Sequence, residues 1–518
     1  MQIDLVVPEF PPAHWNFAFA MDMEGSAYSH PPVGVATLAA YTPAGVEVRI
    51  FDENVEALDL DRLAPTVGIS AMYIQRERAF ELARQLRARG KRVLIGGGIV
   101  HGLPDACRRE ADVVFHGEAE LTWPEFIADL ERGEVKPSYR ASERFDMSQS
   151  RLPRYDLLQM HRYSTGSIQT SRGCPFACDY CDVPLLDGPR PRTKPAHLVM
   201  EEVRLLHRLG HQSIFFIDDH FLGDRKHAVE LLHRLRDYVR AHDHRPIFYC
   251  QATIDVARRP ELLELLYEAN FRRLFIGIES NDLDALRGVN KHHNTKMSVA
   301  DAVREIQRHN ITVWAALLGG FDRDTPEVFG RYLEFAREAG IGMVIPGLLQ
   351  AVPGTSYYDQ VVREDRLIPL RNGYVAGQAG SLDSLPVTNV RPAQMSMDEL
   401  VDGFRRFCAE LYEPDAFVDR LLTSLELGQR PEPGGTQWGQ LWSMREALAR
   451  VVRFFLLDGG PDHRQVLTRV LAHLGKTGFH RADEALFHVV CYKHLREFYS
   501  RAAAGTVAIA DDVRPASA

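Results

Sequence analysis

Hydrophobic runs and amphipathic stretches alternate along the first part of the chain. Up to about residue 140, helical patterns such as VGVATLAAY and AFELARQLRARG separate short apolar runs at IDLVV, VEVRIFD, VGIS, VLIGGG and DVVFHGE. Short buried strands alternating with helices predict a parallel sheet with helices on both faces. We therefore expect an α/β, Rossmann-like domain over residues 1–140, whose ligands would lie beyond the carboxyl ends of its strands.

The same alternation returns after a connector at residues 141–165, which shows little periodic pattern. Between residues 166 and 372 the candidate strands are SIQTSR, SIFFIDD, IFYCQATID, RLFIGIES, TVWAALLGG and MVIPGLLQAV, separated by helical stretches such as HLVMEEVRLLHRL. Six such units predict a partial (β/α)6 barrel. In a barrel of this kind the active site gathers at the carboxyl ends of the strands.

Helical periodicity dominates the remainder, residues 373–518. It is clearest in MDELVDGFRRFCAELY, FVDRLLTSLEL, REALARVVRFFLL and EALFHVVCYKHLREFYSRA, and the Pro- and Gly-rich residues 428–439 predict a loop between helices. We expect a mainly helical C-terminal domain that ends in a flexible tail.

Three cysteines in a C-x3-C-x2-C array follow the first strand predicted for the barrel. Cys174, Cys178 and Cys181 lie within SRGCPFACDYC, residues 171–181. Three thiolates can hold a [4Fe-4S] cluster by three of its irons and leave the fourth iron open to another ligand. A structural zinc site would also use cysteines, but it normally needs a fourth Cys or His at short spacing. Buried thiols that only fill a core, or half of a disulfide pair, would explain the same residues without a metal.

Composition and charge restrict the class of protein. The formal net charge is −9 and no basic cluster stands out, so we expect no nucleic-acid partner. No apolar run is long enough for a transmembrane segment, and the start MQIDLVVPEF lacks the features of a secretory signal. The four cysteines outside the motif lie in apolar contexts typical of reduced core residues, which favours a cytoplasmic location.

The cysteine motif resembles that of the radical S-adenosylmethionine (SAM) superfamily, in which an aromatic residue, here Tyr180, precedes the last cysteine. The resemblance implies that the amino and carboxylate groups of SAM chelate the open iron. An electron from the cluster, supplied by a donor such as flavodoxin or ferredoxin, would then cleave SAM to a 5'-deoxyadenosyl radical. The cofactor carries the difficult chemistry and the protein positions it.

Several later strand ends are similar to the SAM-binding positions of that superfamily. The DDHF segment places His220 where the family usually has Asn, and IGIES and GGFDRDTPE end later strands. The resemblance implies SAM contacts from Tyr180, Asp218, Asp219, Glu279, Ser280, Gly319, Gly320 and Val352. Without a ligand, the acidic pair would instead cap a helix or charge a solvated rim, and Val352 would belong to a simple Pro-Gly turn.

The N-terminal domain resembles the cobalamin-binding domain of cobalamin-dependent radical SAM enzymes. The resemblance implies cobalamin contacts from Ser70, Met72, Gly97, Gly98, Gly117 and Glu118. The motif D-x-H-x-x-G, whose His ligates cobalt, is absent after the first strand, and its literal match at Asp218, His220 and Gly223 lies in another domain. We expect a lower cobalt face without a protein ligand, with Trp15 or a neighbour packed near it, although Trp15 also suits a core position.

The resemblance extends over nearly the whole chain to the hopanoid-methylase-like group with a helical C-terminal domain. It implies a cobalamin-dependent C-methyltransferase that uses a [4Fe-4S] cluster, SAM and cobalamin on a small-molecule substrate, such as a polycyclic lipid or another natural-product precursor. An enzyme with the same cofactors could instead catalyse a radical rearrangement, cyclisation or oxidation. Outside the enzymes, a cobalamin-binding sensor with a structural cluster would carry the same motifs.

Overall fold

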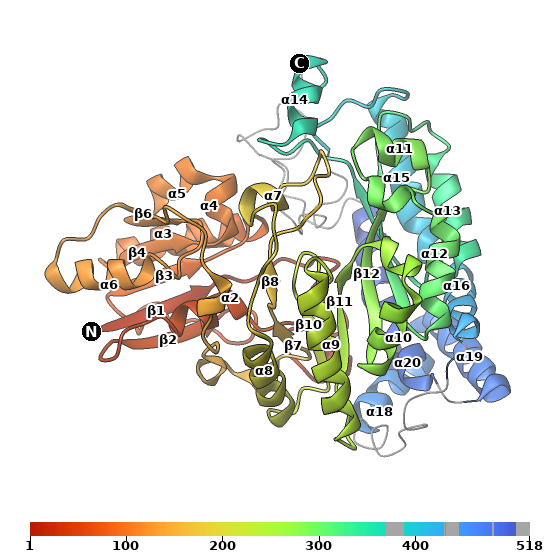
Figure 1. The fold of residues 1–518 in the computed structure, drawn as a ribbon, viewed down its shortest axis with the longest axis horizontal. Helices are drawn as coiled ribbons and strands as arrows, with labels where there is room; N and C mark the ends of the chain where they lie inside the picture. The colour runs from red at the N-terminus through yellow and green to blue at the C-terminus, as the bar shows by residue number, and fades with distance from the viewer. Residues whose placement is uncertain (369–387, 429, 431–444, 479–480, 504–518) are drawn as a thin grey trace.

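Two parallel β-sheets and a group of C-terminal helices make up the computed structural model, which describes residues 1–368, 388–428, 430, 445–478 and 481–503 (Figure 1). None of the helices in these residues combines the length and the apolar character that crossing a membrane requires.

The first sheet has six parallel strands in the order β2-β1-β3-β4-β5-β6. Its strands are β1 (Gln2–Val7), β2 (Glu47–Asp52), β3 (Thr66–Ser70), β4 (Arg92–Gly96), β5 (Val113–His116) and β6 (Ser138–Arg140). Leu5 lies in the core on one face of β1 and Val6 in the core on the other, so both faces of the strand are covered. The expected Rossmann-like fold is confirmed, and β6 is an edge strand that the hydrophobic pattern did not predict.

The helices of this part cover both faces of the sheet (Figure 1). They are α2 (Val33–Ala39), α3 (Arg76–Ala88), α4 (Gly98–Gly102), α5 (Pro104–Glu110) and α6 (Trp123–Arg132), whereas the short α1 (Met21–Glu24) buries Met23 in the core of the barrel. The chain turns in opposite directions after β1 and β3, which are neighbours in the sheet. In doubly wound sheets such a point, at the carboxyl edge, is where ligands bind.

The second sheet is the expected partial (β/α)6 barrel, with six parallel strands in chain order. Its strands are β7 (Gly166–Ile168), β10 (Ser213–Phe216), β11 (Ile247–Ala252), β12 (Phe271–Glu279), β13 (Thr312–Gly319) and β14 (Met343–Leu348). Its helices are α8 (Ala196–Arg208), α9 (Arg225–Arg240), α10 (Pro260–Glu268), α11 (Leu283–Gly288), α12 (Val299–Arg308), α13 (Val328–Ala339) and α14 (Ser356–Arg363).

The first predicted strand of the barrel, SIQTSR, is divided in the structure. Its first part is β7, and its last residues form β8 (Ser171–Arg172), which pairs antiparallel with β9 (Arg192–Thr193). Between them lies α7 (Val183–Leu186), which Figure 1 shows between the N-terminal domain and the barrel.

The C-terminal part is helical, as expected, and lies against the barrel (Figure 1). It contains α15 (Met397–Leu411), α16 (Pro414–Leu427), α18 (Arg445–Arg453), a π-helical turn (Phe454–Asp458), α19 (Gly460–Thr477) and α20 (Ala482–Ala503). At the start of α15, Ser396 and Glu399 form a capping box, which satisfies backbone N–H groups that the helix cannot bond itself. Most of the predicted loop at 428–439 and the predicted tail lie outside the described residues.

Candidate functional site: the cysteine loop and the strand ends around it

The residues between β8 and β9, 173–191, form a loop that contains all three motif cysteines, and we call it the cluster loop. It begins at the carboxyl end of the first barrel strand, as the sequence predicts. The Asp179 N–H donates to the Val289 carbonyl at 3.0 Å, and the Tyr357 N–H donates to the Asp179 carbonyl at 2.8 Å. The Asn290 amide donates to the Ala177 carbonyl at 2.7 Å. Segments that follow two later strands thus hold the loop over the barrel.

The three thiols are partly exposed and not paired in disulfides. Burial raises the pKa of Cys174 to about 11 and that of Cys181 to about 12, and it also raises the pKa of Cys178. Thiols held this way are protonated at neutral pH until a metal displaces the proton. In the described part of the chain, no three His, Cys, Asp or Glu side chains converge as ligands of one metal ion. Thiols on one loop fit a cubane, since each binds a different iron.

Lys291 is a site residue that the sequence analysis missed. Its buried ammonium lies 3.0 Å from the Tyr180 hydroxyl and 3.0 Å from Glu279 Oε1, and it interacts electrostatically with the motif cysteines. The positive charge therefore stabilises thiolates on the loop. Lys291 follows α11 in an irregular segment, where no periodic pattern distinguishes it from a surface lysine.

Glu279, at the carboxyl end of β12, is linked to the cluster loop by Lys291, which contacts both Glu279 and Tyr180. Its backbone has φ +66°, and the β12–β13 register shifts between Gly277 and Glu279. A non-glycine residue in this region costs free energy and is commonly found at functional sites. The predicted SAM contacts Tyr180 and Glu279 are thus brought together, with Lys291 between them.

The two aspartates of the DDHF segment differ in their surroundings. Asp218 is fully buried and accepts hydrogen bonds from the backbone and side chains of Thr170 and Ser171, which precede the cluster loop. Its carboxylate is occupied by protein groups, so it orients the start of the loop. Asp219 is only partly buried and accepts a hydrogen bond from the Gly173 N–H; burial, with Asp187 and Asp218 nearby, raises its pKa to about 7. Of the pair, Asp219 has the freer carboxyl for a ligand.

The predicted SAM residues on the later strands form tight backbone turns. Gly320, after β13, has φ +97°, and its N–H donates to Asp324 at 2.8 Å. Burial raises the pKa of Asp324 to about 6. The Ser280 hydroxyl accepts from the Asp282 N–H, and the Val352 carbonyl accepts from Thr355, so both residues stabilise turns that follow their strands.

Gly319, at the end of β13, is closely packed, because a Cβ there would lie 2.7 Å from the Phe329 ring. This contact alone requires a glycine, so it neither needs nor excludes a ligand. The contacts of Ser280, Gly319, Gly320 and Val352 with SAM stay predictions.

His220, part of the literal D-x-H-x-x-G match, lies beside the cluster loop and not in the N-terminal domain. Its ring centroid is 5.5 Å from that of Phe176, which stacks on His293 at 3.8 Å. Burial lowers the pKa of His220 to about 4, so the imidazole is neutral at pH 7.

The carboxyl edge of the first sheet contains the predicted cobalamin residues Ser70, Met72, Gly97 and Gly98. Gly97 has φ +89°, and a Cβ there would lie 2.7 Å from the Ala71 carbonyl oxygen and 3.3 Å from Ser70 Oγ. Only glycine therefore lets the turn after β4 pack on the turn after β3. Gly98 begins α4, and Met72 is exposed. The edge is shaped as the resemblance implies, and its contacts with cobalamin stay predictions.

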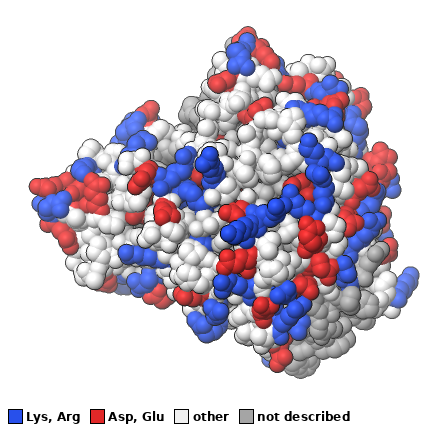
Figure 2. All heavy atoms as spheres, viewed as in Figure 1, with Lys and Arg blue, Asp and Glu red and all other residues white. Residues whose placement is uncertain are grey.

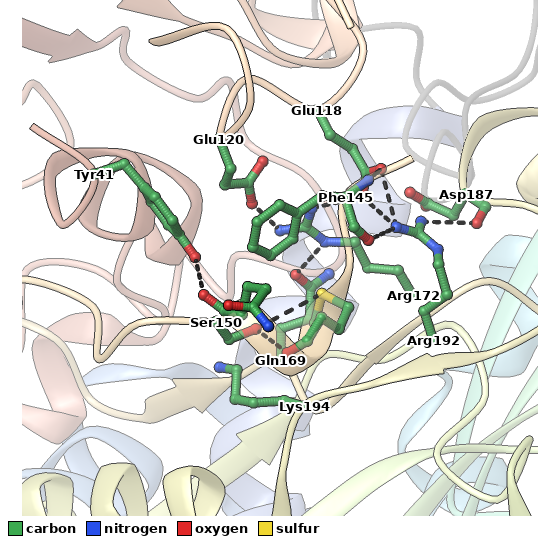
Figure 3. Close-up of polar contacts among 12 residues, drawn as sticks. Tyr41, Glu118, Glu120, Phe145, Ser150, Gln169, Arg172, Asp187, Arg192 and Lys194 are labelled. Carbon is green, nitrogen blue, oxygen red and sulfur yellow. Dashed lines mark hydrogen bonds and ion pairs between the residues drawn. The ribbon is translucent and has the colours of Figure 1, made fainter. Parts of the chain in front are cut away.

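Gly117 and Glu118, which follow β5, differ in what surrounds them. Gly117 has φ +76° and open space around the position of a Cβ. The Glu118 carboxylate instead lies against the barrel, where it binds Arg172 Nη1 at 2.7 Å and Arg192 Nη1 at 3.0 Å (Figure 3). Burial raises the pKa of Glu118, but Arg172 and Arg192 outweigh it, and the net shift is downward. The protein contacts of Glu118 thus indicate a role that the sequence analysis did not predict.

Trp15, the residue expected near the lower cobalt face, packs against the barrel. Its ring meets Phe275 of β12 edge to face at 4.5 Å and lies 4.8 Å from the His14 ring. The indole Nε1 is buried and has no hydrogen-bond partner among the described residues. The loop after β1 therefore joins the N-terminal domain to the barrel strand that carries Glu279.

Acidic and basic side chains are interspersed over the face of the molecule that Figure 2 shows, in the N-terminal domain and over the barrel alike.

Comparison with known proteins gives matches over the barrel and the C-terminal region. The model of the radical SAM superfamily matches residues 168–336, and a domain of unknown function, DUF4070, matches residues 355–507. An uncharacterized methyltransferase of Synechocystis sp. is 34% identical over 424 residues, which cover 81% of this chain and 78% of that protein. Hopanoid C-2 methylase of Rhodopseudomonas palustris is 33% identical over 405 residues, covering 77% and 74%.

Two solved structures share the fold. The cobalamin-dependent SAM radical enzyme OxsB, with aqua-cobalamin and SAM bound, has a TM-score of 0.61 at 14% identity and covers 100% of this chain and 82% of its own. The radical SAM methyltransferase TsrM of Kitasatospora setae, with cobalamin and a [4Fe-4S] cluster bound, has a TM-score of 0.54 at 18% identity and covers 70% and 75%. At these identities the likeness shows the fold alone.

Proposed function

Because the chain belongs to the radical SAM methyltransferase family that includes hopanoid C-2 methylase, we propose that it is a cobalamin-dependent C-methyltransferase. The observation that carries the proposal is the loop of three unpaired cysteines at the carboxyl end of the barrel, placed beside the carboxyl edge of a doubly wound sheet. When bound, a [4Fe-4S] cluster with SAM supplies a carbon-centred radical, and cobalamin supplies the methyl group.

The protein residues in this proposal bind and orient these groups. Cys174, Cys178 and Cys181 hold the cluster, and the Lys291 ammonium offsets the negative charge of their thiolates. Asp219, whose carboxyl is the freer one of the acidic pair, would accept a hydrogen bond from the SAM amino group. The edge formed by Ser70, Met72, Gly97, Gly98 and Gly117 holds cobalamin.

The substrate that we propose is a small apolar molecule, and a polycyclic lipid is the first class to test, since hopanoid C-2 methylase is 33% identical. The electron donor is a small redox protein such as flavodoxin or ferredoxin. We assign the chain to the cytoplasm, because the partly exposed thiols of an unloaded cluster loop need a reducing compartment.

A labelled methyl group tests this proposal. A strain lacking the gene accumulates the unmethylated substrate, and the purified enzyme is incubated anaerobically with that extract, cobalamin, reductant and methyl-deuterated SAM. We expect a product heavier by one labelled methyl group, together with 5'-deoxyadenosine. The Cys178→Ala variant provides the blank.

A radical rearrangement, cyclisation or oxidation without methyl transfer is the second candidate. The cluster loop and the carboxyl edge of the first sheet would serve such a reaction equally well, since the cofactors carry the radical chemistry and the fold does not decide its outcome. If 5'-deoxyadenosine forms and an extract component changes mass without taking up label, this second function replaces methylation.

A further inference from the structure

The cluster loop is closed by a very short pair of strands. β8 and β9 pair only through Ser171 with Thr193 and Arg172 with Arg192. A two-stranded ladder of this length has little stability of its own. The two arginines are directly opposite each other across the ladder, and like charges in that position destabilise it further.

One carboxylate of the N-terminal domain binds both arginines. Glu118 Oε1 lies 2.7 Å from Arg172 Nη1 and 3.0 Å from Arg192 Nη1, and Glu118 Oε2 lies 3.0 Å from the same Arg192 nitrogen. Figure 3 shows both guanidinium groups directed toward it. Glu120 adds a contact of 2.5 Å to Arg172 Nη2. Two carboxylates thus balance two guanidinium groups at the point where the cluster loop begins and ends.

These charges are partly withdrawn from water, with 13% of the Arg172 side chain, 13% of the Glu118 side chain and 20% of the Arg192 side chain exposed. Charge-assisted hydrogen bonds of this kind are stronger than neutral ones. Removing the shared carboxylate would leave Arg192 without its carboxylate partner and Arg172 with Glu120 alone, so the two strands would repel each other.

Further contacts join this group to the connecting segment and to the loop itself. Glu118 Oε2 also accepts from the Phe145 N–H at 2.7 Å. Arg192 donates to the carbonyls of Phe145 and of Asp187, and Asp187 is part of the cluster loop (Figure 3). Arg172 is held from its other side, because its Nε donates to Gln169 Oε1 at 2.9 Å.

The position of Glu118 connects this group to the carboxyl edge of the first sheet. It follows Gly117, which has a positive φ and open space beside it, directly after β5. The carboxyl edge is where a doubly wound sheet binds its ligand. A single side chain therefore touches both ends of the cluster loop from the edge that we assign to cobalamin.

We propose that Glu118 is a positioning residue, which fixes the cluster loop against the carboxyl edge of the N-terminal sheet so that a ligand at that edge alters the environment of the cluster. The part of this inference that concerns cobalamin rests on the proposed function. The part that concerns the loop rests only on the contacts of Glu118.

The test compares Glu118→Gln with two other variants of the full-length, cluster-loaded protein. Arg192→Gln breaks the same contact from the loop side. Asp4→Asn is the matched control: Asp4 lies on β1 in the same domain, accepts two hydrogen bonds from Arg49 at 2.8 and 2.7 Å and one from the Ala64 N–H, and contacts no cluster-loop residue.

Amide hydrogen exchange is the first readout. We expect residues 173–191 to exchange roughly ten-fold faster in Glu118→Gln and in Arg192→Gln than in the wild type, with no change there in Asp4→Asn. Unchanged exchange in both loop-side variants, or equal acceleration in Asp4→Asn, would overturn the proposal. Glu118→Gln and Arg192→Gln break the same contact from opposite sides. If one of these variants fails to fold, the exchange rates of the other still test the proposal.

The EPR spectrum of the reduced cluster with SAM, recorded with and without hydroxocobalamin, is the second readout. We expect cobalamin to shift the spectrum in the wild type and in Asp4→Asn, and the shift to be lost in Glu118→Gln although that variant still binds cobalamin by its absorption spectrum. A shift that persists in Glu118→Gln, or is absent from the wild type, would overturn the coupling. A wild type that binds no cobalamin would instead contradict the proposed function. Amide hydrogen exchange would then still test whether Glu118 positions the cluster loop.

Discussion

The two ends of the barrel both contain Arg–Glu contacts between distant parts of the chain, and these contacts differ in their burial and in their surroundings. At the carboxyl end, Glu118 joins the N-terminal domain to the partly exposed cluster loop. At the amino end, Arg273 of β12 pairs with Glu484 of α20, with Nη2 and Oε2 2.8 Å apart and only 4% and 5% of the side chains exposed.

The amino-end pair is surrounded by packing and not by candidate ligands. Arg273 lies 3.6 Å from the centroid of the Phe487 ring, and Glu484 also accepts from the Thr312 hydroxyl at 2.6 Å. The Arg273–Glu484 ion pair therefore joins the C-terminal helices to the barrel, whereas the Glu118 ion pairs lie at the ends of the loop that contains the cysteines. Variants at the carboxyl end should change the chemistry, and variants at the amino end should change stability.

The largest effect that we expect is loss of the cluster in Cys178→Ala. With one of three ligands removed, the iron content should fall to background and the rate of 5'-deoxyadenosine formation by roughly 10⁴-fold, while the unfolding midpoint of the apoprotein stays unchanged. Chemical iron analysis and chromatography of the nucleoside measure this. Cys408→Ala, at a buried cysteine of α15, is the control and should keep the iron content and the formation of 5'-deoxyadenosine at wild-type level. Iron retained at wild-type level in Cys178→Ala would refute the ligand assignment.

The opposite result is expected for Arg273→Gln at the amino end. It leaves Glu484 buried without its cation, so the free energy of unfolding should fall by about 3–5 kcal/mol. Denaturant titration of the apoprotein measures this, with Arg304→Ala, at an exposed pair with Asp301, as a control expected to change it by less than about 1 kcal/mol. SAM cleavage per folded molecule should be unchanged. If Arg273→Gln lowered the free energy of unfolding by less than about 1 kcal/mol, the amino-end pair would not have the stabilising role that distinguishes it from the carboxyl-end contacts.

The pH dependence of stability gives a second measure of the amino-end pair. Burial raises the pKa of Glu484, but Arg273 and other groups lower it more, to about 2 from its ordinary value of 4.5. The stabilisation is therefore present above pH 4.5 and is lost as the pH falls toward 2, and this shift corresponds to about 3 kcal/mol. In Glu484→Gln this part of the acid dependence should be missing. An identical pH profile for wild type and variant would contradict the assignment.

Lys291→Met should have the smallest of these effects, and it should be on chemistry. Without the ammonium, the thiolates lose a counter-charge and Glu279 loses its partner, so we expect SAM cleavage to fall by roughly 10²-fold, or about 3 kcal/mol. The rate of 5'-deoxyadenosine formation measures this. Lys296→Met, at an exposed lysine nearby, is the matched control. Equal rates in the two variants would show that Lys291 has no part in the site.

The sequence predicts the regular parts of the fold because their signals are local. The strands β13 and β14 are almost entirely apolar and buried along their whole length, and the cysteine spacing is an uninterrupted motif. By contrast, β6 is a three-residue edge strand and β8 and β9 have two residues each, which is too short for a hydrophobic period.

The site was predicted less completely, because contacts between distant segments leave no pattern in the sequence. Glu118 and Asp218 were both expected to contact cofactors, since an acidic residue at the end of a strand gives the same signal whichever way it points. In the structure Glu118 binds two arginines of the barrel, and Asp218 binds Thr170 and Ser171. Lys291 was missed because its partners, Tyr180 and Glu279, are 111 and 12 residues away.

The central claim is that the cysteine loop and the N-terminal sheet act together on SAM, and product analysis without any substrate tests it most directly. Reconstituted protein is incubated anaerobically with SAM and reductant, with and without cobalamin. We predict 5'-deoxyadenosine in both samples and S-adenosylhomocysteine, the product of methyl donation by SAM, only in the sample that contains cobalamin. 5'-Deoxyadenosine without any cobalamin-dependent S-adenosylhomocysteine would contradict methyl transfer, and absence of both products would contradict the radical SAM site.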